Sequence, residues 1–188
     1  MLALITGASS GIGRDMARIL SERGYDLILV ARRKTRLSQL KKELKTNVEI
    51  INLDISSVYN CTELYDQVKD KDIDIVINNA GFGLYGEFTS LKLEKELDMI
   101  DTNIKAVHCL TKLFLEDFKK KDKGYILNVA SSAAFMPGPM MATYYATKAY
   151  VLHFTEAIYE ELRQSGSHVY IGALCPGPVN TNFNKVAG

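Results

Sequence analysis

Residues 2–20, LALITGASSGIGRDMARIL, combine a short apolar run, three glycines and an amphipathic segment. The apolar run predicts a buried strand, and the spacing of apolar residues after Gly13 predicts a helix. Gly7, Gly11 and Gly13 lie between the two, where glycines let the backbone approach a pyrophosphate and the helix N-terminus offers unpaired N–H groups. Their spacing is Gly-x-x-x-Gly-x-Gly, not the more general Gly-x-Gly-x-x-Gly. The stretch therefore predicts a dinucleotide-binding turn, and a structural turn without a ligand is the alternative.

The same alternation of strand and helix recurs along the chain. Continuous Ile, Leu and Val runs are typical of strands that are buried on both faces of a parallel sheet. The runs lie at residues 2–6, 25–31, 48–53, 73–78, 124–130 and 168–175. Between them, apolar residues recur at helical spacing, as in Val107, Leu110, Phe114 and Phe118. The pattern predicts a doubly wound α/β fold of the Rossmann type, with a parallel sheet and one domain over residues 1–188.

Composition and residue spacing argue against several other classes of protein. A chain of 188 residues suits one domain with a sizeable core, and a net charge of +1 gives no basic surface for a nucleic acid. Cys61, Cys109 and Cys175 lie far apart without a Cys-x-x-Cys pair, so we expect reduced thiols in a cytoplasmic protein. The three histidines lack metal-ligand spacing, and no apolar run is long enough to span a membrane. We therefore expect no metal site, no nucleic-acid partner and no membrane partner.

The residues after the second predicted strand bear on the choice of dinucleotide. An NAD-binding protein normally offers Asp or Glu there to accept a hydrogen bond from the ribose 2′-hydroxyl. Residues 27–34, LILVARRK, offer Arg32 and Arg33 and no acid. Because a guanidinium pairs well with a 2′-phosphate, the sequence favours NADP(H) over NAD(H). The alternative is that both arginines are the exposed start of the next helix.

Polar residues also follow the third and fourth predicted strands. Asp54 comes after the third strand, and Asn78, Asn79, Ala80 and Gly81 come at the end of the fourth. Ligands of an open α/β sheet bind beyond the carboxyl ends of its strands, so we expect these residues to face the cofactor. The asparagines could equally cap a turn.

Four later motifs complete an ordered set. They are DTNIKA at 101–106, NVASS at 128–132, TYYATKA at 143–149 and PGPVNT at 176–181. Together with the glycine-rich turn and NNAG, the set resembles the short-chain dehydrogenase/reductase family over essentially the whole chain, and is similar to bacterial NADP-dependent carbonyl reductases. The resemblance implies an oxidoreductase that transfers a hydride between NADP(H) and a small carbonyl or alcohol substrate.

The resemblance also implies a role for each of four residues. Tyr144 would protonate the carbonyl oxygen as a general acid, or act as the base in the reverse direction. A free phenol has a pKa of about 10, and the ammonium group of Lys148 would favour its ionised form. Ser131 would donate a hydrogen bond to the substrate oxygen. Asn103 would hold a water molecule that links Lys148 to solvent.

Two of these residues have a neighbour of the same type. Helical spacing places both Tyr144 and Tyr145 on the face of Lys148, so geometry leaves the choice between them open. The Tyr-x-x-x-Lys pattern of the family selects Tyr144 and leaves Tyr145 as a packing residue or a pocket wall. The family's spacing between serine and tyrosine selects Ser131 over Ser132.

The glycine turn, the strand ends and the family pattern together predict the cofactor-binding residues. They are Gly7, Ser9, Ser10, Gly11, Ile12, Gly13, Arg32, Arg33, Asp54, Asn79, Ala80, Gly81, Tyr144, Lys148, Pro176, Gly177, Val179 and Thr181. The resemblance also implies a homodimer or homotetramer through predicted helices at 102–121 and 143–165. The second helix carries apolar residues around much of its circumference, namely Leu152, Phe154, Ile158, Tyr159 and Leu162.

The substrate side is less specific. Apolar residues near the strand ends could wall a pocket for an apolar or amphipathic carbonyl compound, and core or interface packing would suit them equally well. They are Phe82, Leu84, Tyr85, Phe135, Met136, Met140 and Met141. Family members continue past PGPVNT with a lid and a seventh strand, so we expect this sequence to be part of a longer protein. The alternative function is a catalytically silent NADP(H)-binding sensor or structural protein.

Overall fold

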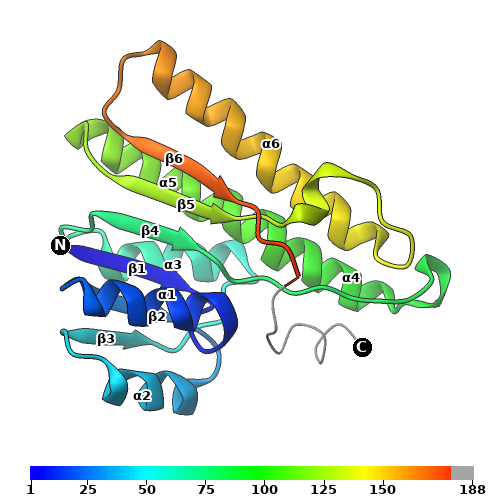
Figure 1. Cartoon of the computed structure of the whole chain (residues 1–188), viewed down its shortest axis with the longest axis horizontal. Coiled ribbons are helices and arrows are strands. Elements are labelled where there is room, and N and C mark those ends of the chain that lie inside the picture. Colours follow the sequence, from blue (N-terminus) through cyan, green and yellow to red (C-terminus); the bar gives the residue numbers. More distant parts are fainter. Residues whose placement is uncertain (179–188) are drawn as a thin grey trace.

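The structure, a computed structural model, describes residues 1–178. Its centre is one sheet of six parallel strands in the order β3-β2-β1-β4-β5-β6 (Figure 1). The strands are β1 (Leu2–Thr6), β2 (Asp26–Val30), β3 (Val48–Ile51), β4 (Ile75–Asn78), β5 (Tyr125–Val129) and β6 (Tyr170–Leu174). The strand order reverses beside β1, which opens a crevice at the carboxyl ends of the strands. The predicted doubly wound fold is therefore confirmed, with every predicted strand in place.

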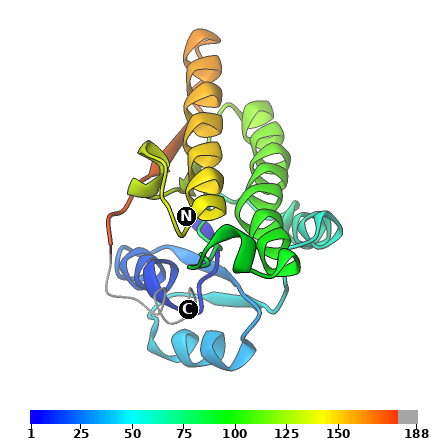
Figure 2. The same ribbon diagram turned by 90° about the vertical axis from the view of Figure 1, so that its right-hand side faces the viewer.

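Helices cover both faces of this sheet. Helices α1 (Gly11–Glu22) and α2 (Lys34–Glu43) pack on one face. The other face is covered by α3 (Val58–Val68), α5 (Val107–Lys121) and α6 (Ala142–Gln164), and α5 and α6 lie side by side (Figure 2). Successive residues of a strand point to opposite faces, so Ile5 packs toward α1 and α2 while Leu4 packs toward α3 and α5. Burial on both faces explains why the strands are continuous apolar runs.

The helical segment before β5 begins earlier than predicted. It starts with α4 (Leu93–Ile100), continues through a π-helical turn at Asp101–Ala106 and becomes α5 without a break. The predicted helix started at residue 102, although Leu93, Leu97 and Ile100 recur at helical spacing. Leu93 and Leu97 are exposed in the folded chain. Short 3-10 turns lie at Phe88–Ser90 and Ser132–Phe135. The π turn, a feature common at functional sites, carries Asn103.

A buried polar network joins the ends of β4 and β5 to the two long helices. Asn78 and Asn128 are neighbours across these strands, and the Asn78 amide nitrogen donates to Asn128 Oδ1 at 2.9 Å and to Thr111 Oγ1 at 3.1 Å. The Asn128 amide nitrogen donates to Thr155 Oγ1 at 2.9 Å. The Thr155 hydroxyl donates its own proton to the carbonyl of Val151 at 2.7 Å. This last bond leaves Thr155 as an acceptor, and it thereby fixes the orientation of both amides.

We predict that Thr155→Val lowers the free energy of unfolding by about 1–3 kcal/mol, because it leaves the buried Asn128 amide without its acceptor. Thr155→Ser keeps the hydroxyl and should lower the free energy of unfolding far less. The matched control is Thr62→Val, since Thr62 on α3 makes the same type of bond, to the carbonyl of Val58, at an exposed position. Urea denaturation measures all three variants. Equal losses from Thr155→Val and Thr62→Val would contradict the prediction.

Candidate active site

A cavity of about 670 Å³ opens at the carboxyl ends of the strands. Its volume falls in the range of small-molecule and cofactor sites. Almost all of the predicted catalytic and cofactor-binding residues that the structure describes line this cavity, and Gly13 and Asn103 are the exceptions. Val179 and Thr181 lie outside the described residues. The fold thus gathers residues from the ends of all six described strands into one site.

The glycine turn is tied to the end of β4. Asn79 donates its side-chain amide to the carbonyl of Thr6 at 3.0 Å, and its backbone N–H donates to the Thr6 hydroxyl at 3.0 Å. A Cβ atom at Gly13 would lie 2.3 Å from the Asn79 amide nitrogen and 2.8 Å from the carbonyl oxygen of Gly7. Gly13 is therefore needed for close packing behind the turn. Asn79 lines the cavity, but its amide is used to hold the turn in place.

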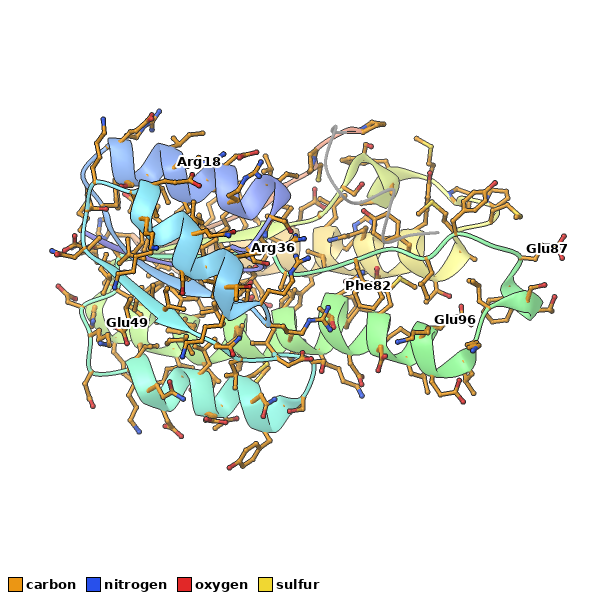
Figure 3. All side chains as sticks on the ribbon, turned by 90° about the horizontal axis from the view of Figure 1, so that it is seen from below. Arg18, Arg36, Glu49, Phe82, Glu87 and Glu96 are labelled. Atoms are coloured by element: carbon orange, nitrogen blue, oxygen red, sulfur yellow. The ribbon has the colours of Figure 1, made fainter. Side chains whose placement is uncertain are left out.

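Three arginines gather where β2 leads into α2. The Arg33 guanidinium donates hydrogen bonds to the hydroxyls of Ser9 and Ser10, at 3.1 and 3.0 Å. Partial burial, with repulsion from Arg36 and Arg32, lowers the pKa of Arg33. Figure 3 shows Arg36 on α2, one turn beyond Arg33, and the sequence analysis did not single it out. Residues three apart in a helix lie on the same face, so the spacing of Arg33 and Arg36 in the sequence could have indicated that Arg36 lies beside Arg33.

The side chains of Ser131 and Tyr144 meet at the wall of the cavity. Burial raises the pKa of Tyr144, and the hydrogen bond with Ser131 acts in the opposite direction. Ser131 Oγ also accepts the backbone N–H of Ala133 at 3.1 Å, which fixes its position at the start of the 3-10 turn. Ser132 lines the cavity as well, but Ser131 is the residue that bonds to Tyr144. The contact with Tyr144 favours Ser131, and the choice between the two serines stays a prediction.

Lys148 lies beneath Tyr144 with only 6% of its surface exposed. Its ammonium group donates a hydrogen bond to the carbonyl of Val129 at 2.8 Å and lies 5.9 Å from the centre of the Tyr144 ring. Burial lowers the pKa of Lys148 to about 8, because a charged amine is poorly solvated there. The group is thus able to change its charge near physiological pH.

Asn103 is fully buried behind the cavity wall. Its amide nitrogen donates to the carbonyl of Phe82 at 2.9 Å and to Thr147 Oγ1 at 3.0 Å, while its oxygen accepts the N–H of Phe82 at 3.0 Å. Thr147 in turn donates to the carbonyl of Tyr144 at 2.7 Å. Asn103 therefore connects the loop after β4 to the helix that carries Tyr144. The sequence analysis did not identify Thr147, which lies within the Tyr-x-x-x-Lys motif.

The predicted substrate wall is only partly correct. Phe82 and Met141 line the cavity, together with Tyr145 and Ala133. The other five residues, Leu84, Tyr85, Phe135, Met136 and Met140, do not line it. Tyr85, Phe135 and Met136 are more than half exposed.

The sequence matches the short chain dehydrogenase family over residues 1–188. The chain belongs to this family. An uncharacterized oxidoreductase of Staphylococcus epidermidis is 35% identical over 186 residues, which cover 98% of this chain and 80% of that protein. A short-chain dehydrogenase from Sphingobium yanoikuyae, solved with NADPH, is similar with a TM-score of 0.92 and 34% identity, and the match covers 100% of this chain and 74% of that one.

Solved short-chain dehydrogenases differ in the dinucleotide they hold. A family member from Burkholderia phymatum, solved with NAD, has a TM-score of 0.93 and 27% identity to this chain, over 98% of it and 68% of the neighbour. The family is one of nicotinamide-dependent oxidoreductases, and the glycine turn that packs against Asn79 fits such a cofactor. Within residues 1–178, no helix is both long and apolar enough to cross a membrane.

We predict that the Lys148 ammonium titrates near pH 8 in the cofactor-free dehydrogenase, because burial disfavours its charge. NMR titration of lysine side chains labelled with carbon-13 measures this directly. The variant Lys148→Met removes one signal and thereby assigns it. A Lys148 signal that is still fully protonated at pH 9 would contradict the prediction.

Proposed function

We propose that this dehydrogenase interconverts carbonyl and alcohol groups with NADP(H), and that Tyr144 transfers the proton. The observation that carries the proposal is the contact of Ser131 with Tyr144 above the buried Lys148, at the wall of a cofactor-sized cavity. When bound, the cofactor supplies or accepts the hydride. The residues of the glycine turn and the arginines at the start of α2 would hold it.

The protein's own residues would handle the proton. Burial keeps the Tyr144 phenol protonated in the resting site, so it can donate its proton to the carbonyl oxygen during reduction. The Ser131 hydroxyl would donate a hydrogen bond to the same oxygen as negative charge develops there. The resulting phenolate would be stabilised by the Lys148 ammonium, and a pKa of about 8 would let Lys148 return a proton near neutral pH.

The preference for NADP(H) rests on charge. Arg33 is held over the glycine turn by Ser9 and Ser10, and Arg32 lies 3.6 Å from Asp54 in an exposed ion pair. A 2′-phosphate at this place would find the guanidinium groups positioned for charge-assisted hydrogen bonds. Among residues 1–178, Asp54 is the one carboxylate that lines the cavity, and it is already paired with Arg32.

Tyr144→Phe should lower kcat for NADPH-dependent reduction by at least about 10²–10⁴-fold, because the general acid is lost. The affinity for NADPH should stay close to that of the wild type. Ser131→Ala should reduce kcat strongly, whereas the neighbouring Ser132→Ala serves as the matched control and should retain most activity. NADPH oxidation with a panel of aldehydes and ketones measures all of these. A kcat of Tyr144→Phe close to that of the wild type, or equal losses in the two serine variants, would refute the assignments.

Arg33→Ala should weaken NADPH binding by about ten- to a hundredfold, since each hydrogen bond to a charged group contributes about 1.5–3 kcal/mol. NADH binding should change little. The control is Arg14→Ala, because Arg14 pairs with Asp15 and does not line the cavity. Fluorescence titration with both cofactors tests the prediction. Tighter binding of NADH than of NADPH by the wild type would overturn the proposed preference.

We also propose that the protein acts as a homodimer or homotetramer through α5 and α6. A cluster of aromatic rings at this surface supports the proposal. His108 shares a 2.7 Å hydrogen bond with the Tyr150 hydroxyl, and its ring stacks on that of Phe154 with ring centres 4.9 Å apart. Leu152 and Leu162, predicted to extend the apolar surface of α6, are instead buried within the monomer. A monomeric mass by light scattering would contradict the assembly.

A further inference from the structure

Two loops meet at the outer end of the cavity. One follows β4 and extends from Phe82 past Glu87, which lies at the far tip of the molecule (Figure 3). The other, residues 136–141, precedes α6. The N–H of Gly86 donates to the carbonyl of Met140 at 2.8 Å, so each loop holds the other. Met140 has a φ of 67°, a left-handed conformation that is uncommon for methionine. Such strain persists only where the surroundings fix the backbone.

This latched loop brings Gly138 directly against Tyr145. A Cβ atom at Gly138 would lie 2.4 Å from two carbon atoms of the Tyr145 ring, so the ring occupies the space that a side chain would need. The Tyr145 ring meets the Tyr144 ring edge-on, with centres 6.2 Å apart and planes at 78°. Tyr145 is therefore held between the catalytic tyrosine on one side and the Gly138 backbone on the other.

The wall around Tyr145 is apolar. Tyr145 lines the cavity and belongs to one cluster with Phe82, Met141 and Ala133. Within residues 1–178, the charged side chains that line the cavity, apart from the buried Lys148, are Arg32, Arg33 and Asp54, which follow β2 and β3. A charged group on the substrate would find no partner beside Tyr145 among the residues that the structure describes, and these residues would not compensate its desolvation.

We propose that Tyr145, positioned by Gly138, determines the size of the group that the substrate can carry beside its carbonyl. The inference rests on the proposed function and names its substrate class: a ketone, or the matching secondary alcohol, with a compact uncharged group. The carbonyl oxygen would face Ser131 and Tyr144, and the apolar group would lie against Tyr145 and Met141. Tyr145 is thus a specificity-determining residue next to the catalytic one.

The test uses acetone, acetophenone and benzophenone as probes of increasing size. Turnover is measured with NADPH, and binding is measured by calorimetry with NADP⁺, with which a ketone cannot be reduced. Tyr145→Ala removes the ring. The ratio of kcat/KM for benzophenone to kcat/KM for acetone should rise by at least about tenfold, and so should the ratio of the two affinities, in line with the effect of small changes in pocket volume. Tyr145→Phe keeps the ring and should preserve the wild-type order of the three ketones.

A double-mutant cycle tests the role of Gly138. Gly138→Ala should displace the ring and change the ratio of benzophenone to acetone in the wild-type background. It should have little effect on this ratio in the Tyr145→Ala background, because the colliding ring is absent. Tyr59→Ala, which removes an exposed ring on α3, is the control and should leave the ratio unchanged. If Tyr145→Ala does not fold, Tyr145→Leu also removes the ring and provides the same comparison.

The outcomes separate this inference from the proposed function. An equal loss of kcat/KM and affinity for all three ketones in Tyr145→Ala would overturn the inference. An equal change of the benzophenone-to-acetone ratio by Gly138→Ala in the wild-type and Tyr145→Ala backgrounds would also overturn it. The absence of ketone binding by both the wild type and Tyr145→Ala would also overturn it. Size-dependent binding in the NADP⁺ complexes, with no turnover by the wild type, would support the inference and refute the proposed redox activity.

Discussion

The site depends on a lysine ammonium that is held almost entirely out of water. Burying one charge costs several kcal/mol even after the protein relaxes. Hydrogen bonds from the surrounding residues must offset this cost, and these residues must be held in place to form them. Lys148 meets the requirement with one hydrogen bond, to the carbonyl of Val129 at the end of β5. Because this bond joins α6 to β5, the helix that carries Tyr144 and the strand that leads to Ser131 must keep one relative position.

Further contacts between the same elements maintain that position. Asn128 precedes Val129 and bonds to Thr155, two turns beyond Lys148 on α6. Asn103 connects α6 to the loop after β4 through Thr147. Polar groups inside a protein interact strongly when they are fully paired and are costly when they are not, so such contacts favour one arrangement of strands and helices. The same rigidity would hold the proposed proton donor beside its substrate.

Much of this arrangement could be predicted from local sequence. Strands were readable because burial on both faces requires continuous apolar runs, and the family motifs located Ser131, Tyr144 and Lys148. Helix α4 was not predicted, and its exposed leucines show that helical spacing of apolar residues does not always indicate a face toward the core. The substrate wall was only partly predicted, since Met140 and Met141 are adjacent residues of the same type, yet only Met141 lines the cavity. The path of the loop determines which methionine faces the cavity, and the apolar character of the two residues does not reveal that path.

The sequence by itself determined the parallel sheet, the glycine turn at its switch point and the order of the motifs, because each depends on local spacing and side-chain type. Only the tertiary structure decided the different positions of Tyr144 and Tyr145. Both share a helical face with Lys148, but Ser131 from β5 reaches Tyr144, while Gly138 from the preceding loop packs against Tyr145. The distinction arises from segments outside the helix, which are brought to it by the folding of the sheet.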